Sequence, residues 1–520
     1  RNNPDETLQQ AVAKSNEIGP DIHVAIHSNA SGPSGKGRGP EIYANRPDTS
    51  GARLAQDIYD QIEKIYPYPE LGRGVLYTDK LYEIIRTLAP AVLLEVAFHD
   101  NEEDANWIIN NIDNIAQAIA DGIENNCGDK MLNLKELEIA TGGKIINGNE
   151  KIIPKYYELD SRSLKEDDFF IPLKGEKVDS HEYILDCVSK GAIGFFISKN
   201  YSDKEKIIKN SIKINNNICI VEVDDTKEAL IKSGKYNRSK HIDIPIVAVT
   251  GSVGKTSTRQ MIASVLKEEK NVLVTEKNYN SNIGVSIMCL QIENQDVCVF
   301  EAGIDKFGEM EELSEIIRPD VVVFTVIGTS HIGTFLTKEN IFNEKTKLLD
   351  NIKGLKKVIA NGDDEYLSKL SPNKNYDVEK YSIDNVGEIK QGQDFLEFET
   401  SIYGSKEKLK INDIGNHNIY NALCAIKVGQ IFNLKKESII NGISSYTNYK
   451  GRLKRIEVNG IVLIDDSYNA SNESMRSGLI TVNHLDSKRK IAVLGDMFDL
   501  GEMSDVIHIK LADVFKIVNY

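Results

Sequence analysis

The stretch IPIVAVTGSVGKTSTRQMIASVL, residues 244–266, decides the fold of the chain around it. A short apolar run at 244–249 is followed by Gly251 and Gly254, which bracket a loop, and then by apolar residues at helical spacing. This pattern predicts a strand, a tight loop and a helix. Such a loop turns its backbone N–H groups toward one point in front of a helix N-terminus, which binds anions. The stretch therefore predicts a phosphate site, with an ordinary strand–helix turn as the alternative.

The residue types in this loop suit a nucleotide. Lys255 adds a point charge for the outer phosphates, and the hydroxyl of Thr256 can reach Mg²⁺. The strict phosphate-loop pattern has a further glycine where Val249 stands. The predicted phosphate-binding set is Gly251, Ser252, Val253, Gly254, Lys255, Thr256 and Ser257.

Length and composition limit the possible classes. A chain of 520 residues is long enough for three or four domains. Its formal net charge of −15 argues against a nucleic-acid partner but leaves a local nucleotide site open. No run of about 20 apolar residues occurs, so we expect no membrane span. The six cysteines are scattered, which favours buried, reduced thiols over a disulfide framework or a zinc ribbon.

After the loop, apolar runs alternate with helical patterns. The runs lie at 271–275, 297–302, 321–327 and 358–360. Alternation of this kind predicts a parallel sheet that is covered on both faces. Ligands of such sheets bind at the carboxyl ends of the strands. Candidate residues follow several of these strands: Lys255, Thr256, Glu301 and His331. Each is a weak signal alone, since a histidine after a strand is more often structural.

The segment before residue 130 carries a second candidate site. A strand at 22–26 runs into His27, and the buried strand at 91–98 carries one charge, Glu95. A carboxylate in an apolar strand is costly unless it has a task or a partner. His27 and Glu95 can converge on a metal ion and its water. A satisfied core histidine and a paired glutamate are the commoner arrangement.

This segment resembles the zinc-dependent N-acetylmuramoyl-L-alanine amidases through IHSNASG at 26–32 and PAVLLEVAFHDNEEDANWI at 90–108. The resemblance implies that His27 is a Zn²⁺ ligand and that Glu95 is the catalytic carboxylate. The family's other His and Glu ligands lie further upstream and have no counterpart here. We therefore expect a partial α/β amidase domain at 1–128 with an incomplete zinc site. Truncation at both ends of the chain, or a fusion of two genes, is an open interpretation.

From residue 131 onward the chain resembles the Mur ligases, and among them the members that add D-alanyl-D-alanine. The motifs occur in the family's order: TGSVGKTST (250–258), NYNSNIG (278–284), FEAG (300–303), IGTSHIG (327–333), NGDD (361–364), GNHNIYNALCA (415–425), GRLKRIEVNGIVLIDDSYNAS (451–471) and VLGDMFDLG (493–501). The resemblance implies a multidomain α/β fold. Its domains would be an α/β N-terminal substrate domain at 131–243, a central parallel-sheet P-loop ATPase domain at 244–445 and an incomplete Rossmann-like domain at 446–520. A strand is expected at 491–494.

The reaction implied by this resemblance is ATP-dependent formation of a peptide bond between UDP-N-acetylmuramoyl-tripeptide and D-alanyl-D-alanine through an acyl phosphate. By family match Lys255 contacts the phosphates, Thr256 and Glu301 hold one Mg²⁺, and His331 holds a second. Lys345 aligns with a lysine that is carbamylated in relatives and then bridges to the second ion. An unmodified lysine cannot bind Mg²⁺, so the role of Lys345 depends on a modification that the sequence does not show. Lys347 stands where the family usually has an acidic residue, so the sequence departs from the family's pattern at this point.

Further residues enter by motif. From the residues alone, Ser161 and Arg162 can hold a phosphate or a uracil edge, with a solvated loop as the alternative. The adjacent carboxylates at 465–466 can hold a metal ion or a ribose, with an ordinary turn as the alternative. His417 and Asn418 can contact the edge of a purine, with N-capping by Asn416 or Asn418 as the alternative. By resemblance, the ATP-binding residues are Asn418, Asn421, Arg452 and Asp466, and His417 is included with them. The substrate-binding residues are Ser161, Arg162, Asn278, Asn280, Asn282, Tyr468 and Asn469.

Three functions remain open. The first is the ligase, the second is a zinc cell-wall hydrolase with a ligase-like extension, and the third is an inactive fusion fragment that only binds ATP. Zinc content and peptidoglycan release separate the hydrolase from the ligase, and ADP release separates the ligase from the fragment. We expect a monomer in the cytoplasm, because no export signal is visible. The third residue of the tripeptide, lysine or diaminopimelate, stays open.

Overall fold

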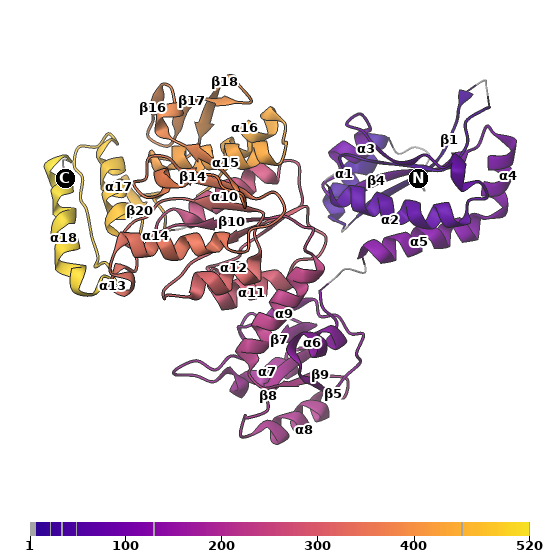
Figure 1. Cartoon of the computed structure of the whole chain (residues 1–520), viewed down its shortest axis with the longest axis horizontal. Coiled ribbons are helices and arrows are strands. Elements are labelled where there is room, and N and C mark those ends of the chain that lie inside the picture. The colour runs from indigo at the N-terminus through magenta and orange to yellow at the C-terminus, as the bar shows by residue number, and fades with distance from the viewer. Residues whose placement is uncertain are drawn as a thin grey trace. The chain divides into compact units, whose positions relative to one another are not determined.

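The computed structural model describes residues 7–20, 22–32, 35–47, 49–127, 131–448, 451–518 and 520. The chain divides into two compact units, residues 1–130 with 293–296 and residues 131–292 with 297–520. Figure 1 shows the helices and strands of each unit. The finer boundaries at 243/244 and 445/446 stay predictions.

The first unit is an α/β layer built on a four-stranded sheet in the order β1-β4-β2-β3. Strand β1 is parallel to β4, and β2 is antiparallel to β4. Helix α2 buries Leu54, Ile58 and Ile62, which share one helical face, and packs against β4 and α5. The elements are α1 (Leu8–Ile18), β1 (His23–Asn29), β2 (Glu41–Ala44), α2 (Ser50–Ile65), β3 (Gly74–Tyr77), α3 (Tyr82–Arg86), β4 (Ala91–Phe98), α4 (Glu102–Asn110) and α5 (Ile112–Cys127).

The second unit begins with a five-stranded sheet in the order β5-β9-β8-β7-β6, in which only β5 is antiparallel to its neighbour. The elements are α6 (Leu134–Thr141), β5 (Lys144–Asn147), β6 (Tyr156–Glu158), β7 (Asp168–Phe170), α7 (Ile184–Ser189), β8 (Gly194–Ser198), α8 (Lys204–Ile214), β9 (Cys219–Val223) and α9 (Thr226–Lys240).

The centre of the second unit is a six-stranded, wholly parallel sheet in the order β11-β12-β10-β13-β14-β15. Every residue of β10 is buried, as the apolar run predicts for a strand covered on both faces. The strands are β10 (Ile246–Thr250), β11 (Val272–Val274), β12 (Val297–Glu301), β13 (Val321–Phe324), β14 (Lys357–Asn361) and β15 (Asp377–Tyr381). The α/β fold class inferred from the sequence is confirmed.

Helices and a small antiparallel sheet surround this core. Helix α10 packs against α15 and α16, and α11 packs against α9 and α12. The helices are α10 (Lys255–Leu266), α11 (Asn282–Leu290), α12 (Glu309–Ile317), α13 (Ile332–Phe335), α14 (Lys338–Thr346), α15 (His417–Ile431) and α16 (Lys436–Ser444). The small sheet has the order β16-β17-β18 and comprises β16 (Ile389–Gln391), β17 (Leu396–Ile402) and β18 (Ser405–Ile411).

The C-terminal segment, residues 451–518, contains β19 (Lys454–Val458) paired antiparallel with β20 (Ile461–Asp465), then α17 (Asn472–Asn483) and α18 (Ser504–Ala512). The strand predicted at 491–494 is wrong. Residues 491–498 have no regular structure, and the side chains of Ile491 and Val493 are exposed. A strand needs a neighbour for its N–H and C=O groups, and no described segment pairs with this one.

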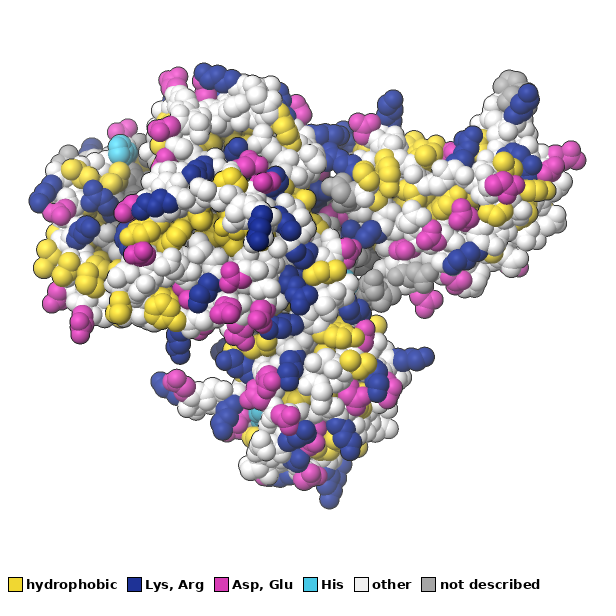
Figure 2. All heavy atoms as spheres, in the orientation of Figure 1, with side chains coloured by type: hydrophobic (Ala, Val, Ile, Leu, Met, Phe, Trp, Pro, Cys, Tyr) yellow, Lys and Arg dark blue, Asp and Glu magenta, His cyan; other side chains and the backbone are white. Residues whose placement is uncertain are grey.

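The charged side chains on the surface and the state of the cysteines agree with what the composition predicts. On the face shown in Figure 2, basic and acidic side chains are interspersed. Five cysteines are free and buried, as predicted: Cys187, Cys219, Cys289, Cys298 and Cys424. The side chain of Cys127 lies outside the described part. Among the described helices, none has the length and apolar character that crossing a bilayer needs.

Candidate active site

The loop between β10 and α10 depends on two glycines. Gly251 has φ 149°, and a Cβ there would lie 1.9 Å from Oγ1 of Thr325. Gly254 has φ 84° and is the N-cap of α10. Other residues rarely adopt such positive φ values. The loop therefore brings its backbone close to β13 and opens the N-terminus of α10 toward the carboxyl end of the sheet.

Two hydroxyl groups from the segment that follows β13 hold this loop. Thr325 Oγ1 lies 2.6 Å from the carbonyl oxygen of Val253 and donates to it. Ser330 Oγ donates to the carbonyl oxygen of Ser252 at 3.3 Å. These contacts, together with the Ser252 N–H, which donates to the carbonyl oxygen of Val326 at 2.7 Å, hold the loop in one shape.

Lys255 lies back across its own loop. Its Nζ donates to the carbonyl oxygens of Gly251 at 2.9 Å and Ser252 at 3.4 Å. Burial lowers the pKa of the Lys255 ammonium, and the nearby Glu301 carboxylate opposes that shift. Carbonyl contacts of this kind are weaker than a charge-assisted bond to an anion, so Lys255 can turn to a phosphate without breaking the fold.

Glu301, at the end of β12, is the centre of a buried polar cluster. Its Oε2 accepts from Thr256 Oγ1 at 3.0 Å and faces Arg259 Nη1 at 3.3 Å. Its Oε1 accepts from Asn280 Nδ2 at 2.9 Å. Arg259 is fully buried and Glu301 is 4% exposed. The carboxylate is therefore held in one orientation beside the phosphate loop.

Arg452 reaches this cluster from the C-terminal segment. Its Nη2 donates to Thr256 Oγ1 at 3.1 Å, and its guanidinium stacks 4.5 Å above the ring of Tyr468. Thr256 thus accepts from Arg452 and donates to Glu301 with one hydroxyl.

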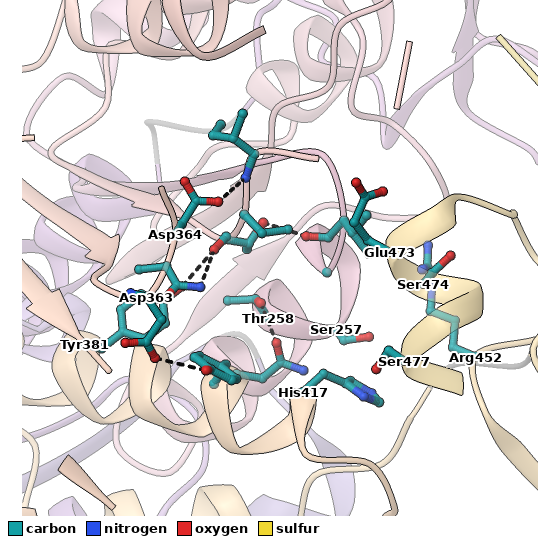
Figure 3. Close-up of a pocket in the computed structure, with 18 of the residues that line it drawn as sticks. Ser257, Thr258, Asp363, Asp364, Tyr381, His417, Arg452, Glu473, Ser474 and Ser477 are labelled. Atoms are coloured by element: carbon teal, nitrogen blue, oxygen red, sulfur yellow. Dashed lines mark hydrogen bonds between the residues drawn. The ribbon is translucent and has the colours of Figure 1, made fainter. Parts of the chain in front are cut away.

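A cavity of about 470 Å³ extends from the phosphate loop toward β14 and α15. Figure 3 shows Asp363, Asp364 and Tyr381 on one side, and Arg452, Glu473, Ser474 and Ser477 on the other. These two sides come from the central sheet and from the C-terminal segment. The sides of the cavity are also formed by Val253, Gly254, Ser257, Thr258, His417, Tyr420, Asn421 and Asp466.

Helix α15 presents a neutral, ordered polar edge to this cavity. Thr258 Oγ1 donates to Asn421 Oδ1 at 2.7 Å, and Asn421 Nδ2 donates to Asn418 Oδ1 at 3.0 Å. Burial lowers the pKa of His417 to about 4, so its imidazole is neutral at pH 7. Within the described residues, Nδ1 of His417 has no hydrogen-bond partner. A neutral ring with an open nitrogen suits a heteroaromatic base.

His331 and Lys345 form a second group of buried or half-buried side chains near Lys255. His331 has φ 61°, and its Nδ1 is 3.5 Å from Asp305 and 3.6 Å from Asp499. Lys345, in α14, is only 3% exposed. Burial and the charge of Lys255 hold the pKa of Lys345 well below its usual value. Burial is the main cause that lowers the pKa of His331, and the charges of Lys255 and Lys345 lower it further. These interactions indicate that His331, Lys255 and Lys345 lie in one region.

Several residues selected from the sequence lie apart from this cluster. Arg162 is exposed and pairs with Asp160, its Nη2 2.7 Å from Oδ2, and Ser161 is beside it. Asn282 bonds Glu312, and Asn278 is exposed. Tyr468 and Asn469 follow β20 and are exposed, and of the two the ring of Tyr468 meets the cluster through its stacking on Arg452. Asp466 lines the cavity and accepts from the Leu453 N–H at 3.2 Å.

The candidate zinc site of the first unit is not assembled. His27 and Glu95 are register neighbours on β1 and β4, but His27 Nε2 lies 3.7 Å from Glu83 Oε2. Burial raises the pKa of Glu95, and its Oε2 has no hydrogen-bond partner in the described part of the chain. Over those same residues, no three His, Cys, Asp or Glu side chains are placed to hold a metal ion. These residues do not fit a zinc site, and we assign them no zinc chemistry.

Sequence reasoning missed three contributors. Arg259 follows the phosphate loop within α10 and reads as an exposed helical arginine. Tyr420, whose hydroxyl donates to Asp363 at 2.9 Å, lies inside a quoted motif without a role. Glu473 reads as an acidic residue in the first turn of a helix. For Arg259 the sequence did contain a signal: a charged residue among the apolar residues of a helix is rarely buried unless it has a partner.

Comparison with known proteins agrees with both resemblances. Residues 249–429 match the Mur ligase middle domain, and residues 451–519 match the family described as Mur ligase, glutamate ligase domain. Residues 1–125 match N-acetylmuramoyl-L-alanine amidase.

Individual relatives cover most of the second unit. The UDP-N-acetylmuramoyl-tripeptide--D-alanyl-D-alanine ligase of Bacillus subtilis (strain 168) is 30% identical over 354 residues, which is 67% of this chain and 75% of that protein. The protein of the same name from Borreliella burgdorferi is 28% identical over 72% of this chain and 83% of its own length. The crystal structure of MurF from Acinetobacter baumannii superposes with a TM-score of 0.64 at 27% identity, covering 74% of this chain and 84% of that one.

Proposed function

Because the chain belongs to the Mur ligase family, we propose that it joins D-alanyl-D-alanine to UDP-N-acetylmuramoyl-tripeptide while ATP is converted to ADP and phosphate. Members of this family form peptide bonds at the expense of ATP in peptidoglycan synthesis. The choice of this member is supported by the names of the relatives. The observation that carries the proposal is the Thr256–Glu301 pair beside a pre-formed phosphate loop, at the edge of a cavity large enough for a nucleotide.

The chemistry needs an activated carboxyl group, because a carboxylate does not react with an amine. The carboxylate oxygen of the tripeptide would attack the γ-phosphorus, and the bond from that phosphorus to ADP would break. The amine of the dipeptide would then attack the acyl carbon, lose a proton and release phosphate. Catalysis of phosphoryl transfer rests on positioning and on charge neutralisation. Lys255 and Arg452 are the cations that we assign to that task.

Mg²⁺ would neutralise phosphate charge when bound. It is usually held by one or two carboxylates together with phosphates and water, so the Thr256 hydroxyl and the Glu301 carboxylate fit the first ion. His331 would take part in holding a second. The N-H groups of the loop bind phosphate, and His417, Asn418 and Asn421 form the polar edge for the base. Ser161, Arg162, Asn278, Asn280 and Asn282 stay as proposed contacts of the UDP-linked substrate. ATP and UDP-sugars are cytoplasmic, so the proposed reaction belongs there.

Lys345 should be carbamylated in the active protein. Burial lowers the pKa of Lys345, which favours the neutral form of the amine that can add to CO₂ and lose a proton; the product is an anion beside Lys255 that can hold Mg²⁺. We expect Lys345→Ala to lower kcat by about 100-fold or more. We also expect the parent protein, without any substitution, to lose activity in CO₂-depleted buffer and to regain it with bicarbonate. ADP release measures both effects. Full activity of Lys345→Ala would contradict this role.

ADP release tests the proposed function directly. Release should require the UDP-linked tripeptide and D-alanyl-D-alanine together, and omission of either should leave only background. Parallel reactions with the lysine and the diaminopimelate tripeptides identify the third residue. Absence of release with both substrates, from a version extended at both ends, would refute the ligase assignment.

A further inference from the structure

Glu473 makes a contact that none of the roles above requires. It lies in the first turn of α17, whose capping is already supplied by Ser471 and Ser474. Glu473 Oε1 accepts from the Thr329 N–H at 3.0 Å, and Oε2 accepts from Thr329 Oγ1 at 3.0 Å. Lys338 Nζ lies 3.8 Å from Oε1. One carboxylate from the C-terminal segment thus binds both donors of a residue in the loop that follows β13.

The partner loop is shaped for this carboxylate. Gly328 precedes Thr329, and a Cβ on Gly328 would lie 2.8 Å from the carboxyl carbon of Glu473. A side chain at residue 328 would push the carboxylate away. The Glu473 side chain is 23% exposed, so water screens its hydrogen bonds only in part. Two bonds to a charged acceptor make this one of the stronger links between the two parts.

The loop that Glu473 holds also carries residues of the proposed site. Ser330 follows Thr329 and donates to Ser252 in the phosphate loop. His331 comes next, in the left-handed region at φ 61°. A non-glycine residue in that region is strained and persists only where its surroundings hold it. Glu473 supplies part of that constraint, and it does so only when the C-terminal segment is docked.

We propose that Glu473 is a positioning residue that couples docking of the C-terminal segment to the placement of the 328–331 loop. It acts through Thr329 on His331 and on the phosphate loop. The importance of this effect for turnover rests on the proposed ligase function. The structural coupling itself does not, because it concerns only the order of the loop.

Hydrogen exchange of residues 327–336 tests the coupling without any assumption about activity. We expect faster exchange in Glu473→Ala and in Thr329→Val than in the parent, because both lose bonds that hold the loop. Asp486→Ala is the matched control, since Asp486 is exposed in the same segment and should leave exchange unchanged. Equal exchange in the parent and Glu473→Ala would overturn the proposal even if the protein proves not to be a ligase.

Measurements of turnover form the second part of the test. Glu473→Ala should lower kcat by about tenfold or more with KM for ATP within about twofold, because two bonds to a charged group are lost. Glu473→Gln keeps one accepting oxygen and should be intermediate. Combining Glu473→Ala with Thr329→Val should cost little more than Glu473→Ala alone, since residues acting as a unit are not additive.

Three results would overturn the proposed effect of Glu473 on turnover. They are losses of kcat that add in the double variant, a rise in KM for ATP with kcat unchanged, and full activity of Glu473→Ala. An altered KM alone would mean that Glu473 contacts the nucleotide instead. A parent without turnover would refute the ligase function, and the exchange result would then decide the coupling by itself.

Discussion

Lys255→Ala is expected to lower ligase turnover by about 100- to 1,000-fold while leaving the thermal midpoint of unfolding nearly unchanged. Its ammonium is one of the two cations assigned to neutralise phosphate charge in the proposed reaction. In the described part of the chain that ammonium bonds two carbonyl oxygens of its own loop, so its removal costs the fold little. ADP release and thermal unfolding of the same preparation measure the two effects.

Lys267→Ala is the control for this variant. Lys267 follows α10 and is exposed, so its loss removes a charge of the same sign from the same region. It should keep parental turnover. Equal turnover in Lys255→Ala and Lys267→Ala would show that the phosphate loop takes no part in the reaction. It would contradict the chemistry that we assign to this site.

Glu301→Gln is expected to cost both turnover and stability. The substitution keeps the size of the side chain but removes the negative charge that Arg259 and Thr256 face. Leaving a buried guanidinium without its carboxylate costs about 3 kcal/mol or more of unfolding free energy. Loss of the Mg²⁺ ligand should lower kcat by about 100-fold and raise the Mg²⁺ concentration for half-maximal activity.

Urea unfolding and a Mg²⁺ titration of ADP release separate these two effects. Glu311→Gln, an exposed change on α12, is the matched control and should alter neither. A variant that is destabilised but keeps parental Mg²⁺ dependence would assign Glu301 to structure alone. A variant with parental stability would show that Arg259 does not need this carboxylate.

The parallel sheet was predictable because its signal is local. Runs such as 297–302 and 321–327 are apolar throughout, and only a strand covered on both faces buries such a run. The strand expected at 491–494 shows the limit of that reasoning. The residues have strand composition, but strand formation requires a partner, and pairing is a property of the tertiary structure.

The residues of the candidate site also fall into two groups, those that the sequence predicts and those that only the tertiary structure identifies. Gly251, Gly254, Lys255 and Thr256 are contiguous, so a short motif places them together. Arg259 and Glu473 act on residues 42 and 144 positions away in the chain. Their sequence neighbours carry no sign of those partners, because the contacts arise from strand order and from docking of the C-terminal segment.

The sequence by itself determined the α/β class, the phosphate loop and the family resemblances, since each depends on periodicity or on residues close together in the chain. Only the tertiary structure decided that Thr256 links Glu301 to Arg452, that the burial of Lys345 lowers its pKa, and that Glu473 holds the loop before His331. It also decided that His27 and Glu95 are adjacent without forming a metal site in the described residues. Burial and long-range contact are set by how the elements pack, and no short window of sequence contains that information.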